Sequence, residues 1–104
     1  MRNTENTLRG LPPVHPGALL REDILPHVPM TKTDIARALG ISRAQLYALL
    51  AEKAPVTAAM ALRLGRFLGN GPELWLNMQS NYDLEILAGK MKRELAHIPQ
   101  MKAA

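Results

Sequence analysis

Apolar residues recur at helical spacing along most of the chain. Leu20 and Ile24 would share one helix face, and Leu64 and Leu68 another. Leu and Ala supply 31 residues against 13 for Val, Ile and Thr, a balance that favours helices over strands. The pattern predicts an all-α fold of five helices. They run from near Pro16 to Pro26, from about Lys32 to Leu39, from Ser42 to about Leu50, from Thr57 to the glycines at 69 and 71, and from Pro72 to about Ala96.

Residues that cap helices stand where the second, third and fourth helices are expected to begin. Ser42 and Gln45 form an S-x-x-Q capping box, in which each side chain binds a backbone N–H of the first turn. Thr31 with Asp34 approximates the same box, and Thr57 opens the fourth helix.

Gly40 separates the second and third helices. Within one continuous helix it would cost about 1 kcal/mol relative to alanine, and the capping box at Ser42 would have no role. At a corner, Gly40 takes the left-handed conformation, Ile41 enters the core and Ser42 starts a new helix. We therefore predict two short helices joined by a tight turn.

A short helix, a glycine turn and a second short helix form the outline of a helix-turn-helix motif, whose second helix lies in the DNA major groove. The residues expected to face one core are Ile35, Ala36, Leu39, Ile41, Leu46, Leu49 and Leu50. Arg43, Ala44, Tyr47 and Ala48 are then left on the outer face of the second helix.

That outer face carries side chains suited to reading DNA. Arg43 can donate two hydrogen bonds to guanine, Ala44 and Ala48 allow close approach and contact with a thymine methyl, and Tyr47 can reach a phosphate or a base edge. Polar groups at the starts of both helices would bind phosphates. The predicted DNA-binding residues are Lys32, Thr33, Ser42, Arg43, Ala44, Gln45, Tyr47 and Ala48. The same face also fits a protein that never touches DNA, with a solvated Arg43 and a half-buried Tyr47.

The last predicted helix has two parts, with a possible kink near Ser80 or Asn81. Trp75 and Tyr82 lie at helical spacing, which favours core or dimer packing, and Gln79 beside them would satisfy buried polar groups together with Asp83. Beyond them runs an apolar stripe that is longer than a small core needs. We expect its residues Leu84, Leu87, Met91 and Leu95 to form a dimer interface.

The chain of 104 residues has room for one domain. We expect a flexible N-terminal arm over residues 1–15, the helix-turn-helix domain with its dimerisation helix over 16–96, and a flexible tail over 97–104. The absence of cysteine excludes disulfides and thiolate metal sites and fits the cytoplasm. A net charge of +4 permits a polyanionic partner, while the longest apolar run is too short for a membrane partner.

The candidate catalytic groups form no convincing site. Glu22 and Asp23 are adjacent on a helix and point to different sides, so they make a poor acid–base pair. His15, His27 and His97 lack the spacing of metal ligands, and no phosphate-binding glycine loop is present. We therefore expect neither an enzyme nor a cofactor.

Three segments together resemble a known family. "HPGALLREDILPHV", "TKTDIARALGISRAQLYALL" and "TAAMALRLGRFLGNGPELWLNMQSNYDL" are similar, in order and spacing, to the HigA-type (VapI-like) antitoxins of the phage-repressor-like (XRE) helix-turn-helix class. The resemblance covers about residues 15–90. It implies a five-helix phage-repressor-like fold with an extended C-terminal helix.

The resemblance further implies a homodimer on a palindromic operator, repression of the antitoxin's own operon, and neutralisation of a RelE/HigB-like toxin that cleaves messenger RNA. One position departs from the family, which often has a glycine and then Lys or Arg after the reading helix, where this chain has Glu52 and Lys53. A stand-alone helix-turn-helix regulator without a toxin partner is the alternative, and a helical adaptor that binds only protein is a third reading.

Overall fold

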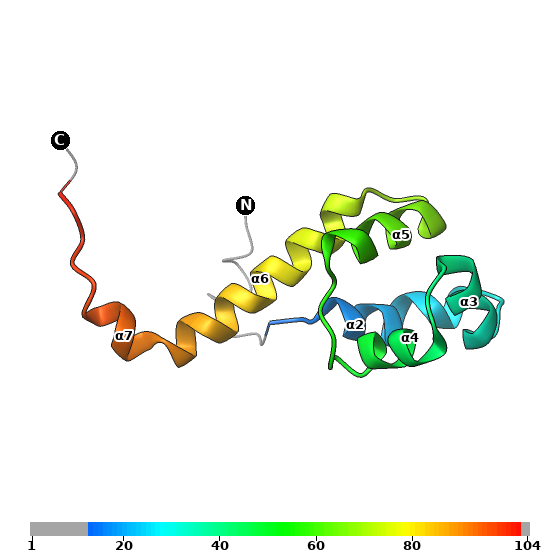
Figure 1. The fold of residues 1–104 in the computed structure, drawn as a ribbon, viewed down its shortest axis with the longest axis horizontal. Coiled ribbons are helices and arrows are strands. Elements are labelled where there is room, and N and C mark those ends of the chain that lie inside the picture. Colours follow the sequence, from blue (N-terminus) through cyan, green and yellow to red (C-terminus); the bar gives the residue numbers. More distant parts are fainter. Residues whose placement is uncertain (1–12, 103–104) are drawn as a thin grey trace.

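The computed structural model describes residues 13–102, and all of its regular structure within that range is helical (Figure 1). The prediction of an all-α fold is confirmed. The elements are α2 (Pro16–Leu19), a π-helical turn η1 (Leu20–Ile24), a 3-10 turn η2 (Leu25–His27), α3 (Lys32–Leu39), α4 (Arg43–Leu50), α5 (Ala58–Leu68), α6 (Pro72–Lys90) and α7 (Lys92–Ala96).

The first predicted helix is less regular than expected. It starts at Pro16 but widens into η1, where the Leu25 N–H donates to the Leu20 carbonyl, and then tightens into η2. Pro26 explains the change, because its ring has no N–H and clashes with the carbonyl four residues earlier.

The predicted caps of α3, α4 and α5 are all present. The Ser42 hydroxyl accepts from the Gln45 N–H at 3.0 Å, and the Gln45 side chain accepts from the Ser42 N–H at 2.9 Å. Thr31 accepts from the Asp34 N–H, and Thr57 accepts from the Met60 N–H. These contacts fix the first turns of the three helices.

Gly40 forms the predicted corner, with φ of 73°. Its N–H donates to the Arg37 carbonyl at 3.1 Å, and the Ile41 N–H donates to the Ala36 carbonyl at 3.0 Å, which is the Schellman arrangement. Ile41 then packs against the core. The corner places α3 and α4 in contact as two consecutive short helices (Figure 1).

The core lies at one end of an elongated molecule of 53 × 27 × 25 Å. Trp75 on α6 is fully buried, and its Nε1 donates to the Asn70 side chain at 2.9 Å. The buried apolar residues are Leu20, Leu25, Ile35, Ala36, Leu39, Leu46, Leu49, Leu50, Val56, Ala61, Leu64 and Trp75. The seven residues predicted to face one core are thus buried or, for Ile41, packed against it.

Gln79 on α6 is buried and joins two parts of the fold, as expected. Its Oε1 accepts from the Val56 N–H at 2.8 Å, and its Nε2 donates to Asp83 at 3.0 Å. The bond to Val56 connects the chain segment that follows α4 to α6. Its loss would be costly, because the buried Val56 N–H would have no partner.

The second half of α6 and all of α7 project from the core (Figure 1). The predicted kink near Ser80 or Asn81 is wrong, since α6 is unbroken through both residues, and the break falls at Met91 instead. Gly89 lies two residues before the break, outside the core, where low helix propensity has most effect.

The N-terminal boundary of the domain also needs a correction. His15, which the sequence prediction assigns to the arm, caps α2 and is buried. Residues 1–12 of the expected arm, and residues 103–104 of the expected tail, lie outside the described residues. Residues 97–102 contain no helix.

Candidate DNA interface

The outer face of α4 is open to solvent as predicted at three of its four positions. Arg43, Ala44 and Tyr47 are exposed, and Tyr47 keeps half of its surface accessible although it is a large aromatic residue. Ala48 is half-buried. The Arg43 Nη1 lies 3.5 Å from the Thr33 hydroxyl, at the limit of a hydrogen bond, so the guanidinium remains available to a ligand.

Ser42 and Gln45 are exposed but already engaged in the capping box. The acceptor atoms of both side chains bind backbone N–H groups, whereas the hydroxyl hydrogen and the amide Nε2 remain as donors. Donors are what a phosphate oxygen requires. Both residues can therefore bind a phosphate while they continue to cap α4.

Lys32 and Thr33 lie exposed at the start of α3. The Thr31 cap binds the N–H of the third helical residue, and the first two N–H groups of a helix have no partner within it. The starts of α3 and α4 thus offer backbone donors beside the predicted side chains. All eight residues predicted to bind DNA belong to α3, α4 or the Ser42 cap.

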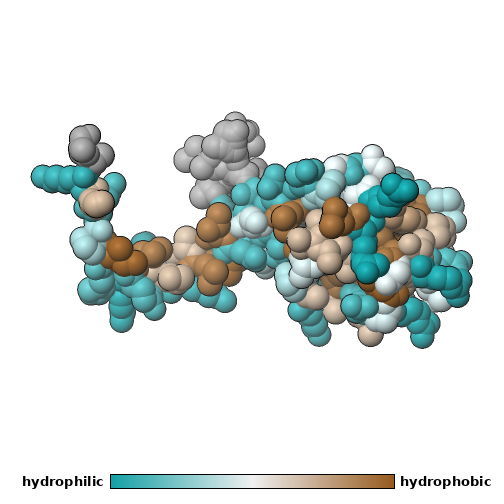
Figure 2. Space-filling view, turned by 45° about the horizontal axis from the view of Figure 1, so that its top comes forward, coloured by the Kyte–Doolittle hydropathy of each residue, from teal (hydrophilic) through white to brown (hydrophobic). Residues whose placement is uncertain are grey.

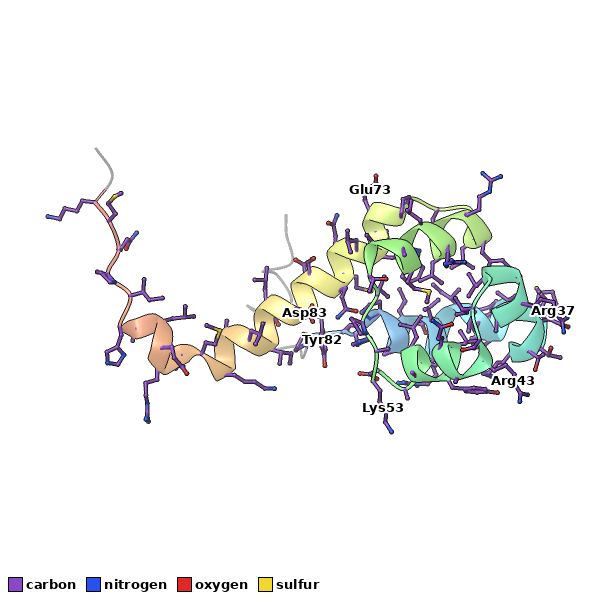
Figure 3. All side chains as sticks on the ribbon, viewed as in Figure 1. Arg37, Arg43, Lys53, Glu73, Tyr82 and Asp83 are labelled. Atoms are coloured by element: carbon purple, nitrogen blue, oxygen red, sulfur yellow. The ribbon has the colours of Figure 1, made fainter. Side chains whose placement is uncertain are left out.

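Two exposed cations beyond the predicted set lie near this surface. Arg37 pairs with Asp34 at 2.9 Å on α3. Lys53 follows α4, and Figure 3 shows it along the same edge of the molecule as Arg43. The sequence contains the signal for Lys53, since the family often has a cation there, but the preceding Glu52 left the direction of the backbone open.

The structure resolves that direction. Glu52 has φ of 62°, the left-handed conformation usually taken by glycine. Its N–H donates to the Leu49 carbonyl at 3.0 Å, and the Lys53 N–H donates to the Ala48 carbonyl at 2.9 Å. A glycine is absent, yet the chain leaves α4 by the turn that a glycine would allow.

Arg21 on η1 supports this turn from outside. Its Nη1 donates to the Leu50 carbonyl at 2.6 Å and to Glu52 Oε2 at 3.1 Å, and its Nε donates to Glu22 at 2.9 Å. The hydrogen bonds to Glu22 and Glu52 raise the pKa of Arg21 further above its usual range. The guanidinium is therefore a permanent charge at the end of α4.

His15 caps α2 and packs against α6. Its Nδ1 accepts from the Gly17 N–H at 2.9 Å, and its ring meets the Tyr82 ring edge to face, with centroids 4.9 Å apart. Burial lowers the pKa of His15, while the charges of Glu52 and Asp83 oppose part of that shift. The His15 ring thus joins the start of α2 to α6.

The predicted dimerisation residues form an exposed stripe on the projecting helices. Leu84 is 67% exposed and Leu87 50%, and Met91 and Leu95 are also exposed. Figure 2 shows apolar surface along this part of the molecule. So many accessible large apolar side chains on one element are typical of an interaction surface.

Neither a metal site nor a membrane segment is found in residues 13–102. No three His, Asp or Glu side chains in that range are grouped to hold a metal ion. No helix there is both long and apolar enough to cross a bilayer.

Comparison with known proteins identifies the family, although no family model matches the chain. Virulence-associated protein I of Dichelobacter nodosus is 38% identical over 76 residues, which span 73% of this chain and 70% of that protein. Antitoxin HigA-1 of Vibrio cholerae is 36% identical over 72 residues, 69% of this chain and 68% of that protein. The chain belongs to the HigA family of antitoxins.

A solved structure of the HigA family supports the assignment. The Pseudomonas aeruginosa antitoxin HigA, solved with the higBA promoter, has a TM-score of 0.80 and 30% identity, over 88% of this chain and 99% of that chain. Relatives of this kind are DNA-binding antitoxins rather than enzymes. The fold and family expected from the sequence are confirmed.

Proposed function

We propose that this chain is the DNA-binding antitoxin of a toxin–antitoxin module, which binds its own operator as a homodimer and represses its own operon. The observation that carries the proposal is the exposed Arg43–Tyr47 face, set between two capped helix starts on a helix-turn-helix pair. The HigA relative solved with its promoter supports the same reading.

The proposed roles follow from the chemistry of each side chain. Arg43, near the start of α4, donates to guanine in the major groove, and Tyr47 contacts a base edge or a phosphate one turn later. Ala44 and Ala48 permit close approach. The groups proposed to bind phosphates are the side chains of Lys32, Thr33, Ser42 and Gln45 and the backbone N–H groups at the starts of α3 and α4.

The apolar stripe of Leu84, Leu87, Met91 and Leu95 is proposed to pair with its copy in a second chain. A two-fold dimer would present two α4 helices to a palindromic operator, with half-sites about one helical turn of DNA apart. An aqueous monomer would leave this stripe in contact with water at a cost that pairing removes.

The proposed protein partner is a RelE/HigB-like toxin, and the proposed compartment is the cytoplasm. A stand-alone regulator would share the DNA surface but have no toxin. Co-expression with the product of the neighbouring gene tests this point: a complex that suppresses a growth-arresting ribonuclease supports the antitoxin. Failure to bind or suppress any neighbouring product would leave the regulator.

Arg43→Ala tests the DNA surface. Titration of the duplex upstream of the chain's own coding region should show a loss of about 1–3 kcal/mol in binding and relaxed preference at one base pair in each half-site. Lys32→Ala should weaken all sequences more evenly. Unchanged specific binding by Arg43→Ala would refute the assignment of α4 as the reading helix.

A further inference from the structure

The end of α4 carries an acidic residue where the proposed interface needs a positive charge. Glu52 directly precedes Lys53, and Lys53 lies along the same edge as Arg43 (Figure 3). A free carboxylate at this position would repel DNA phosphates. It could also fold onto the Lys53 ammonium and neutralise it.

The structure shows what restrains that carboxylate. Glu52 Oε2 accepts from the Arg21 Nη1, and the same nitrogen binds the Leu50 carbonyl, so one guanidinium holds both the side chain and the backbone of the turn. Glu22 binds the Nε of Arg21 and fixes its orientation. The three acceptors surround a planar group whose donors point in fixed directions.

The restraint is long-range and specific to this turn. Arg21 lies 31 residues before Glu52, on η1, so the contact depends on the packed fold. The Glu52 side chain is 34% exposed, whereas Glu22 on the same arginine is 65% exposed. Of the two carboxylates, Glu52 is the one drawn in against the protein at the end of α4.

We propose that Arg21 is a positioning residue for operator binding: it holds the Glu52 carboxylate against η1, away from Lys53, so that Lys53 is free to bind a DNA phosphate. The inference rests on the proposed DNA-binding function. Arg21 itself touches no DNA in this proposal. Glu52 can then occupy a position where the family often has glycine, without neutralising the charge of Lys53.

The test is a double-mutant cycle on the full chain, with Kd measured for the duplex upstream of its own coding region over a range of salt concentrations. Arg21→Ala should weaken binding about fivefold to tenfold and reduce the magnitude of the salt slope by about 1, as for one lost phosphate contact. Glu52→Gln alone should change Kd by less than about threefold. Arg21→Ala with Glu52→Gln should restore both the affinity and the slope, because no carboxylate remains to capture Lys53.

Glu22→Gln is the matched control, because it removes an equal charge from the same arginine without altering the turn. It should not rescue Arg21→Ala. Equal rescue by Glu22→Gln would show that only net charge matters and would overturn the proposal. Rescue by Glu52→Gly but not by Glu52→Gln would overturn it too, since the defect would then lie in the backbone.

Thermal unfolding of every variant separates loss of fold from loss of binding. Should Arg21→Ala unfold, Arg21→Gln keeps a neutral donor near the Leu50 carbonyl and should retain the binding defect, and wild-type binding by Arg21→Gln would contradict the inference. A wild-type chain that binds its duplex while Arg21→Ala binds equally well refutes the inference alone. A wild-type chain that binds no duplex refutes the proposed function and the inference together.

Discussion

The two helices of the helix-turn-helix pair end in the same turn, built from different residues. After α3 the left-handed residue is Gly40, and after α4 it is Glu52, with φ of 73° and 62°. In both turns the N–H of that residue binds a carbonyl three residues back, and the next N–H binds one five residues back. An arginine from another element binds the last carbonyl of each helix: Arg63 binds Leu39, and Arg21 binds Leu50.

The difference lies in the space beside each turn. A Cβ at Gly40 would come within 2.6 Å of the Arg63 Nη1, so a side chain there would displace the end of the arginine that binds this turn. At Glu52 there is room for a side chain, which reaches its own arginine. The comparison teaches that a positive φ alone does not fix the residue. At Gly40 a side chain would disturb the arginine that binds the turn, whereas at Glu52 the side chain is itself bound by the arginine.

Gly40→Ala should produce the largest change in stability. A left-handed alanine costs about 1–2 kcal/mol, and displacement of Arg63 adds about 1 kcal/mol through its weakened hydrogen bonds to the Leu39 and Gly40 carbonyls. We expect a total loss of about 2–3 kcal/mol, measured by urea unfolding. Gly69→Ala is the matched control, because Gly69 has φ of 77° but no neighbour within 4 Å of its Cβ position. Equal losses at the two glycines would show that Arg63 is irrelevant to the Gly40 turn.

At Glu52, substitution by glycine should be better tolerated than substitution by alanine. Both Glu52→Gly and Glu52→Ala remove the carboxylate, but only glycine relieves the left-handed strain. The glycine variant should therefore be more stable than the alanine variant by about 1 kcal/mol, again in urea. Should Glu52→Ala prove as stable as Glu52→Gly, the two turns would differ in conformational strain and not only in residue type.

The Gly40 turn could be predicted from the sequence, and the course of the chain at Glu52 could not. A glycine between two helical segments indicates a left-handed turn, and the Ser42–Gln45 capping box beside it is formed by residues close in sequence. Glu52 gives no local sign of a left-handed turn. The arginine that binds its side chain is Arg21, 31 residues earlier, and this contact exists only in the folded chain.

The same distinction explains the other outcomes. Exposed residues such as Arg43 follow from helical periodicity, so most of the candidate interface could be identified from the pattern. The burial of His15 depends on packing between distant segments, since its ring meets Tyr82 on α6. α6 continues through Ser80 and Asn81 although both are weak helix formers, and it breaks at Met91, two residues after Gly89.

The smallest expected effect is a pH dependence of the unfolding free energy, caused by His15, whose pKa responds to the Glu52 charge. Burial lowers the pKa of His15, so the unfolded chain binds more protons than the folded one between the folded pKa and about 6.5. Stability should be full above about pH 6.5 and fall as the pH drops toward the folded pKa. The slope should be no steeper than one proton, because one group titrates. Protonation of Nδ1 is unfavourable in the folded chain because it also breaks the cap to Gly17.

Unfolding in urea from about pH 7 to pH 5 measures this slope, and the matched variant is His15→Asn, whose amide oxygen can still cap Gly17 but does not titrate. Glu52→Gln should make the loss larger, since the Glu52 charge supports protonated His15. The penalty of Gly40→Ala should stay constant over the same range, because that turn is held by backbone carbonyls and an arginine and not by a histidine. A slope that persists in His15→Asn would place the titrating group elsewhere and remove this difference between the two turns.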